Sequence, residues 1–162
     1  GNSNNMNLDT LISSNAVINT PDIKSKKRAL EVLAETLASQ PAETLDALEL
    51  FQLLTEREKL GSTSIGHGVA LPHARTKLTD QAIGAFLKLK DGIDFDSPDD
   101  KKTDLIFALL VPEYYTDEHL KILAYLASLF SDETFCKEIR DTNDVINIHK
   151  HLINWQVTSQ AS

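Results

Sequence analysis

The sequence predicts a single α/β domain: a central mixed β-sheet with helices packed on both of its faces. The chain of 162 residues has the length of one domain, and 41% hydrophobic residues are enough for a packed core. Short apolar runs typical of strands are interleaved with longer segments in which leucines recur at helical spacing. Because the helical segments cluster in pairs, we expect a mixed sheet rather than strict alternation of strands and helices.

The first part of the chain predicts one strand and two helices. An apolar run over residues 16–19 is stopped by a proline. Leucines at helical spacing predict a helix over 25–39, and a second amphipathic pattern runs from Pro41 to about Leu60. Gly61 follows directly and is predicted to end the second helix in the left-handed conformation.

The middle of the chain predicts the core strands. A polar turn over 75–81 precedes a strand over 82–90, and Asp91-Gly92 is a turn signal that opens a polar loop. Seven apolar residues, 105–111, are followed by Pro112, which is typical of a strand buried on both faces.

Three helices are expected after that strand. Thr116 is the predicted N-cap of the first, with two acidic residues in the first turn, as the helix dipole favours. The second begins at Ser131-Asp132, and the third covers 142–155, where His149 and His151 are read as surface residues. We expect a polar tail or tag remnant over 1–8, one domain over 9–156, and a second tail over 157–162.

Composition excludes several classes of partner. A net charge of −8 and a pI of about 5.0 argue against nucleic acid and against an anionic membrane surface. The sequence has neither a membrane-spanning run nor a signal peptide, so we expect a cytoplasmic protein with no direct membrane insertion. The single cysteine, Cys136, excludes a disulfide framework and a cysteine-rich metal cluster.

The most informative stretch lies between Gly61 and His73. Three of the six glycines fall within residues 61–68, and such a loop can turn several backbone N–H groups onto one anion. Pro72 restricts the backbone beside His73. A histidine beside an amide-rich pocket suggests a nucleophile that carries a phosphoryl group; the alternative is a half-buried histidine beside glycines that only make turns.

Other charged residues allow two interpretations each. Arg57 lies one turn from a helix end, where it either favours the helix dipole or binds phosphate bidentately. His119 follows the buried strand in a first helical turn, where anions collect in α/β folds. The basic cluster of Lys24, Lys26, Lys27 and Arg28 is either a solvated face or a partner surface.

The chain resembles the IIA domains of the fructose–mannitol class of the bacterial phosphoenolpyruvate-dependent phosphotransferase system. The family pattern is an acidic residue, six positions, an aliphatic, Gly, two positions, aliphatic-Ala-aliphatic, Pro-His and a small residue. Glu58 and residues 65–74 satisfy every position. Segments 25–31, 57–63 and 105–112 are similar to the nitrogen-regulatory branch, whose members stand alone rather than being fused to a permease.

The resemblance implies a function. His73 would accept a phosphoryl group on Nε2 from an HPr-like phosphocarrier, while its other ring nitrogen donates to a carbonyl or carboxylate. Arg57, the loop amides and the Thr63 hydroxyl would stabilise the transferred group, and His119 would hydrogen-bond or orient it. An apolar docking face with basic or polar edges should surround His73. No cofactor is expected, because the sequence has no Walker loop and no carboxylate pair for Mg²⁺.

Two departures from the branch pattern are expected to matter. Ser64 stands where glycine is common and would be strained if φ is positive there. His67 stands where asparagine is common and would bring a second imidazole near His73.

Alternatives remain at the level of sequence. The phosphoryl carrier either regulates targets such as a transporter or a sensor kinase, or it is a stand-alone sugar IIA protein that passes phosphate to a IIB domain. A further alternative is a zinc site built from His67, His73 and His119, which a nearby arginine opposes.

Overall fold

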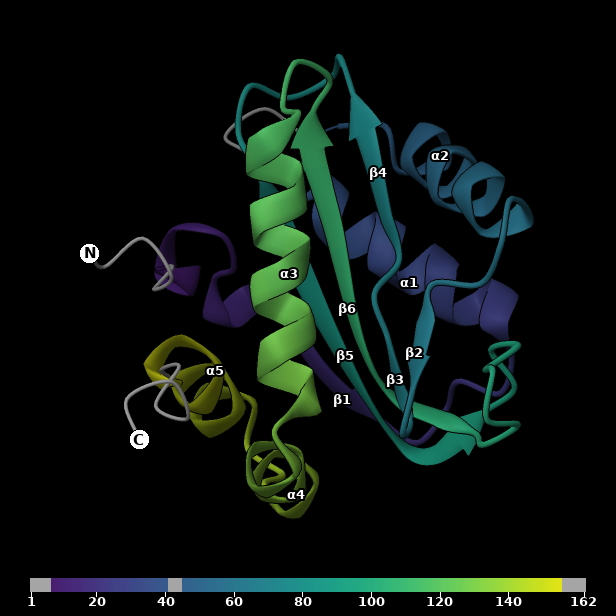
Figure 1. The fold of residues 1–162 in the computed structure, drawn as a ribbon, viewed down its shortest axis with the longest axis vertical. Coiled ribbons are helices and arrows are strands. Elements are labelled where there is room, and N and C mark those ends of the chain that lie inside the picture. Colours follow the sequence, from purple (N-terminus) through teal and green to yellow (C-terminus); the bar gives the residue numbers. More distant parts are fainter. Residues whose placement is uncertain (1–6, 41–44, 156–162) are drawn as a thin grey trace.

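A six-stranded mixed sheet forms the centre of the molecule (Figure 1). The computed structural model describes residues 7–40 and 45–155. The strands are β1 (Val17–Thr20), β2 (Ser64–Gly66), β3 (Val69–Ala70), β4 (His73–Thr76), β5 (Ile83–Ile93) and β6 (Thr103–Pro112). Their order is β1-β5-β6-β3-β2, and β4 also pairs with β6. β1 pairs with β5 in parallel, and β3 and β4 each pair with β6 in parallel, whereas the β2–β3 and β5–β6 pairs are antiparallel. The predicted mixed sheet is therefore confirmed.

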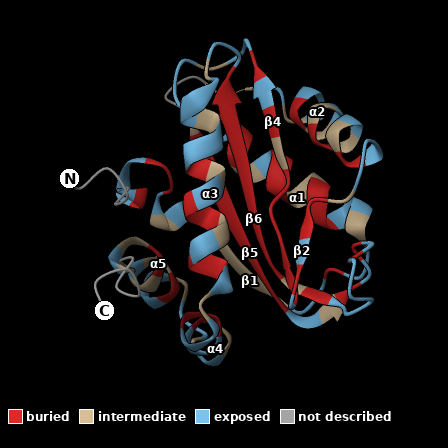
Figure 2. Cartoon of the chain, in the orientation of Figure 1, coloured by how far each residue is buried: buried red, intermediate tan, exposed pale blue. Residues whose placement is uncertain are grey.

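Helices cover both faces of this sheet, as predicted. They are α1 (Lys26–Ala38), α2 (Ala47–Lys59), α3 (Asp117–Ser131), α4 (Glu133–Asp141) and α5 (Val145–Asn154), preceded by the 3₁₀ helices η1 (Leu8–Thr10) and η2 (Ser14–Ala16). Figure 1 shows α3 across one face and α1 across the other. Burial is concentrated in β5, β6 and the helix faces turned toward them (Figure 2). Phe130 of α3 stacks on Phe86 of β5 with ring centroids 5.7 Å apart, which fixes the helix on the sheet.

Strands β3 and β4 behave as one strand interrupted by Pro72. Val69 pairs with Leu105 and His73 with Leu109, so the register along β6 is the same on both sides of the break. Proline has no N–H to donate to the ladder, but its carbonyl still accepts from the Leu109 amide at 2.9 Å. His73 is therefore the first residue of β4 and is held beside the most buried strand of the sheet.

The predicted turn at Asp91-Gly92 is wrong. β5 runs through both residues to Ile93, with a register shift against β6 between Lys88 and Ile93. A Cβ at Gly92 would lie 2.7 Å from Cβ of Lys102, so glycine permits a close approach of two strands here. Gly92 is therefore required by an irregularity within the strand and not by a turn.

Helix ends differ from the prediction in detail. α2 ends at Lys59 with Leu60 as C-cap, and Gly61 has a φ of 152°, far from the left-handed helical value. The N-cap of α2 is Asp46, whose carboxylate accepts from the Leu48 amide at 2.9 Å, while the predicted start at Pro41 lies outside the described residues. Thr116 is the N-cap of α3, but its side chain makes no capping bond.

The predicted domain edges also shift slightly. Leu8, placed in the tail by the sequence, is 1% exposed and packs in the core. The predicted tail over 157–162 lies outside the described residues, as does most of 1–8. His149 is only partly exposed, and its Nε2 lies 2.8 Å from the Ile12 carbonyl, so it links α5 to the segment between η1 and η2 rather than lying free on the surface.

Within residues 7–40 and 45–155, the helices are too short or too polar to cross a bilayer.

Candidate functional site

The ring of His73 is oriented by a single backbone contact. Its Nδ1 lies 2.8 Å from the Leu71 carbonyl oxygen, which can only accept, so Nδ1 carries the hydrogen. The neutral ring then has its lone pair on Nε2. This is the arrangement that the family resemblance implied, and the short segment from Leu71 through Pro72 to His73 produces it.

The environment of His73 keeps the ring neutral. Burial lowers its pKa below the ordinary value, and the nearby positive charge of Arg57 acts in the same direction. The hydrogen bond to the Leu71 carbonyl and the negative charge of Glu58 oppose this shift. A ring that stays unprotonated at neutral pH is a competent nucleophile without a separate base.

His119 lies beside His73, as predicted. It is in the first turn of α3, and the two rings meet edge to face with centroids 5.3 Å apart. Its Nε2 is buried and makes no hydrogen bond to any residue that the structure describes. Burial, with the charges of His73 and Arg75, lowers the pKa of His119. A buried nitrogen without a partner is unusual in a folded protein and marks the His119 ring as a candidate part of the site.

An open cavity of about 690 Å³ surrounds His73. Arg57, Arg75 and His119 line it together with apolar residues from α2 and α3. Leu60 is 85% exposed and Leu120 66% exposed, so apolar side chains flank the cavity at the surface. Acidic side chains also reach its rim: Glu56, Glu113 and Asp117. The surface around the ring thus combines exposed leucines with charged edges, the composition expected of a docking face.

The position of Arg57 is compatible with both interpretations that the sequence left open. Its Nη1 donates to the Gly61 carbonyl at 2.8 Å, just beyond the end of α2, which is the structural role. It also lines the cavity of His73, and its charge acts on that ring. No acidic side chain in the described ranges is ion-paired with it.

Arg75 was missed by the sequence analysis, which placed it in a polar turn. It lies two residues after His73 on β4 and therefore on the same face of the strand. Its Nη1 donates a long hydrogen bond of 3.4 Å to the Tyr115 carbonyl. Period-two spacing from His73 was the available signal, but a four-residue strand with polar members did not stand out.

The glycine-rich segment does not surround His73 with amides, so that expectation is wrong. β2 and β3 form a hairpin, and Gly66 and Gly68 adopt positive φ at its tip. The amides of this segment are already used: His67 N–H donates to Asp99 Oδ2 at 2.8 Å and Gly66 N–H to Ser64 Oγ at 3.3 Å. The positive φ values that suggested an anion cradle serve a tight turn instead.

Thr63 is likewise directed away from the cavity. Its hydroxyl donates to Glu58 Oε2, its amide donates to Glu58 Oε1 at 3.2 Å, and its residue is 6% exposed. Glu58 Oε1 also lies 2.9 Å from Nζ of Lys26, which further pairs with Asp96 at 3.1 Å. Glu58, the acidic residue of the family pattern, therefore links α1, α2 and the segment that leads into the β2–β3 hairpin.

Two members of the basic cluster at the start of α1 are engaged in ion pairs within the chain. Lys26 is committed to Glu58, and Arg28 lies 3.8 Å from Glu31 and 3.7 Å from Glu35 on its own helix. Arg28 is exposed and pairs only with acidic residues of its own helix, in agreement with the solvated-face interpretation. Lys26 instead forms an ion pair with Glu58 of α2, which the sequence did not predict.

The two departures from the branch pattern have other consequences than expected. Ser64 is not among the described residues with positive φ, so it carries no strain of that kind. His67 takes the left-handed position, with a φ of 56°, and lines a different cavity from His73. The three histidines therefore do not converge, and the described residues contain no group of three or more His, Cys, Asp or Glu placed to hold a metal ion.

Comparison with known proteins agrees with this geometry. Residues 10–155 match the family model described as "Phosphoenolpyruvate-dependent sugar phosphotransferase system, EIIA 2". The nitrogen regulatory protein of Bradyrhizobium diazoefficiens is 37% identical over 147 residues, covering 91% of this chain and 95% of the relative. That of Escherichia coli K12 is 39% identical over 141 residues, covering 83% and 85%. The crystal structure of nitrogen regulatory protein IIA-Ntr from Neisseria meningitidis superposes with a TM-score of 0.81 at 35% identity, covering 88% and 96%. The chain therefore belongs to the EIIA 2 family of the phosphoenolpyruvate-dependent sugar phosphotransferase system.

Proposed function

We propose that this chain is a regulatory phosphoryl carrier: His73 accepts a phosphoryl group from an HPr-like phosphocarrier, and the phosphorylation state decides which partners it binds. The proposal rests mainly on the orientation of the His73 ring. Nδ1 is committed to the Leu71 carbonyl, and Nε2 is left as the nucleophile in a cavity shared with two guanidinium groups.

The transfer is a direct exchange between two imidazoles. The lone pair of Nε2 forms a bond to phosphorus while the phosphorus–nitrogen bond of the carrier breaks, and that electron pair returns to the carrier's ring. Nδ1 keeps its hydrogen and its bond to the Leu71 carbonyl throughout. Neither a general base nor a metal is needed for this balance.

Charge stabilisation is then the main task of the surrounding residues. Arg57 and Arg75 supply positive charge on two sides of the cavity, and the unpartnered Nε2 of His119 supplies a hydrogen bond to a phosphoryl oxygen in its N–H tautomer. Thr63 acts indirectly by holding Glu58 and the end of α2, on which Arg57 is carried.

A regulatory output is favoured over sugar transport by the relatives. The three similar proteins reported above carry nitrogen-regulatory names, and their similarity extends over most of this chain. The alternative is a sugar IIA protein, which must pass its phosphoryl group to a IIB domain.

A reconstituted phosphoenolpyruvate cascade tests both parts. Native protein should acquire an acid-labile label, and His73→Ala should acquire none, while His151→Ala, a matched change at a partly exposed histidine on α5, should label normally. Undiminished labelling of His73→Ala would overturn the assignment. Labelled protein should keep its label when mixed with IIB domains; rapid transfer to one of them would establish the sugar alternative.

A further inference from the structure

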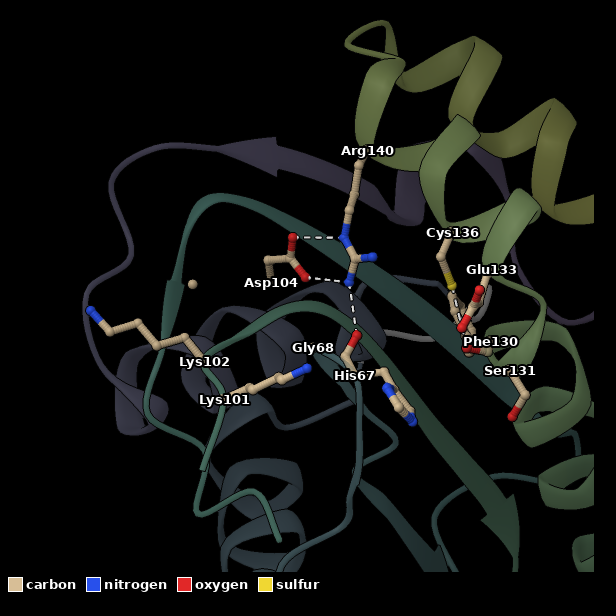
Figure 3. A pocket seen from close by; sticks show the side chains of 11 residues that line it. His67, Gly68, Lys101, Lys102, Asp104, Phe130, Ser131, Glu133, Cys136 and Arg140 are labelled. Carbon is tan, nitrogen blue, oxygen red and sulfur yellow. Dashed lines mark hydrogen bonds and ion pairs between the residues drawn. The ribbon is translucent and has the colours of Figure 1, made fainter. Parts of the chain in front are cut away.

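A second cavity, of about 580 Å³, lies between the tip of the β2–β3 hairpin, the start of β6 and helix α4 (Figure 3). Its charged and polar lining includes His67, Lys101, Arg140, Ser131 and Glu133, and it shares no lining residue with the cavity of His73. None of these side chains has a part in the proposed phosphoryl transfer.

Arg140 is built rigidly into this cavity. Its Nε donates to Asp104 Oδ2 at 2.9 Å and its Nη2 to Asp104 Oδ1 at 2.8 Å, a bidentate pair. Nη2 also donates to the His67 carbonyl at 3.0 Å. Underneath, the buried ammonium of Lys88 donates to the Arg140 carbonyl at 2.7 Å and fixes the end of α4 on the sheet. The guanidinium is thus positioned before any ligand arrives.

The sequence of the hairpin is adapted to this guanidinium. A Cβ at Gly68 would lie 2.6 Å from Nη2 of Arg140 and 2.8 Å from Oδ1 of Asp104, so only glycine leaves room for the ion pair. His67 is held in the left-handed conformation from both sides, by Asp99 at its amide and Arg140 at its carbonyl. Such conformations in non-glycine residues occur preferentially at functional sites.

One nitrogen of Arg140 remains available. Nη1 makes no hydrogen bond within the described part of the chain, and Figure 3 shows it on the side of the guanidinium that faces Cys136. Figure 3 also shows the Lys101 side chain reaching toward the hairpin, whereas Lys102 points the other way. Lys101 has no ion-pair partner among the residues described. Two cationic groups therefore border the hairpin end of the cavity: Arg140 is ion-paired with Asp104, whereas Lys101 makes no ion pair in the described ranges and only its charge acts on nearby Asp99.

The opposite end has the reverse polarity. Glu133, at the start of α4, lines the cavity beside Ser131 and Phe130, and no side chain in the described ranges is ion-paired with it. A second negative charge on a ligand would meet this carboxylate, whereas an ammonium or amide group would be attracted or hydrogen-bonded. Phe130 also lines the cavity, although its ring is packed in the core against Phe86 and Phe107.

We infer that this cavity binds a small amino acid-like molecule, with its carboxylate toward Arg140 and Lys101 and its ammonium or amide group toward Glu133. The inference does not depend on phosphorylation of His73. Because Arg140 holds the hairpin that leads through Leu71 to His73, a bound molecule would also be placed to affect the presentation of that ring.

Titration followed by backbone amide NMR tests the inference. The probes are straight-chain ω-amino acids from glycine to 6-aminohexanoate, with butyrate and succinate at equal ionic strength as controls. We expect saturable shifts at the amides of 67–68, 101–104 and 131–140 for at least one ω-amino acid. Butyrate should bind at least 10-fold more weakly, and succinate no better than butyrate.

Variants separate a site from a general charge effect. Lys101→Gln should weaken binding about 10-fold, while Lys27→Gln, the same change on an exposed residue of α1, should not change it. Glu133→Gln should reduce the preference for ω-amino acids over butyrate. The inference is overturned if no probe gives saturable shifts at 10 mM, if shifts occur only around Arg57 and His119, or if Lys27→Gln has the effect of Lys101→Gln.

Discussion

The imidazole rings of His73 and His119 meet edge to face, at an interplanar angle of 67°. One ring has a backbone partner for Nδ1, and the other has a buried Nε2 with none among the described residues. The two rings therefore contribute different atoms to the site: His73 has its lone pair on Nε2, and His119 has a ring nitrogen without a hydrogen-bond partner among the described residues.

His119→Ala should slow phosphorylation without abolishing it. Loss of one hydrogen bond to the transferred group corresponds to about 1.4 kcal/mol, or roughly a 10-fold lower rate of labelling. The measurement is the rate of label uptake from a phosphorylated carrier. Complete loss of labelling, with an unchanged urea midpoint, would instead give His119 the role assigned to His73.

Arg57→Ala should have a larger effect. Removing a guanidinium from the charge that develops on the phosphoryl group is expected to lower the rate by about 100-fold. Arg57→Lys should recover part of that loss, because the positive charge returns without the planar fork. Arg57→Ala also removes the hydrogen bond to the Gly61 carbonyl, and the NMR signals of residues around Gly61 report on that loss separately. If Arg57→Lys restored the Gly61 signals and the full labelling rate together, the slow labelling of Arg57→Ala would be explained by the disturbed segment and not by a direct role of the guanidinium.

The folding stability should fall as pH drops below about 6.5. Burial lowers the pKa of both His73 and His119 in the folded state, so the unfolded chain binds more protons in this window. Stability therefore rises with pH up to about 6.5 and the contribution of these rings is constant above it. Urea midpoints at pH 7.5, 6.5 and 5.5 should show a smaller decrease for the His73→Ala, His119→Ala double variant than for native protein.

Glu58→Gln should destabilise the fold by about 1–3 kcal/mol. The Glu58 side chain is 4% exposed and carries the contacts to Lys26 and Thr63 across three segments of the chain. Glu31→Gln is the matched control, since Glu31 belongs to an exposed pair with Arg28 and should change stability by less than about 0.5 kcal/mol. Equal effects in urea unfolding would show that the Glu58 cluster contributes nothing specific.

The thiol of Cys136 should be nearly inert in the folded protein. Burial raises its pKa to about 11, and Sγ lies 3.3 Å from the Phe130 carbonyl. At pH 8 roughly one thiol in a thousand is then ionised, so reaction with a disulfide reagent should be slow in buffer and immediate in urea. Fast reaction in buffer would mean that α4 opens readily from the sheet.

Elements of this fold were predictable from sequence wherever a pattern is compatible with only one structure. Apolar runs located β5 and β6, and leucine spacing located α1 and α3, because burial in a layered domain imposes those periods. The free Nε2 of His73 was implied by the family resemblance; from the residues alone, Pro72 predicted only that the chain partly sets the position of His73, and the bond from Nδ1 to the Leu71 carbonyl is a contact that the structure supplies.

Tertiary contacts decided the rest. Positive φ was correctly expected near Gly66 and Gly68, but local sequence does not reveal whether the amides of a turn face a ligand or, as here, Asp99 and Ser64. Arg75 had only the weak signal of its period-two spacing from His73, and Arg140 reaches its cavity through the placement of α4 on the sheet, which no local pattern records.

Hydrogen bonds to β6 on both sides of His73 have a consequence for signalling. The carbonyl of Pro72 and the paired residues of β4 hold the main chain of His73 against the central strand. Under the proposed function, the phosphoryl group would then add its charge and bulk at the ring itself, and the electrostatic part of a partner's discrimination between the two forms should weaken as salt is added.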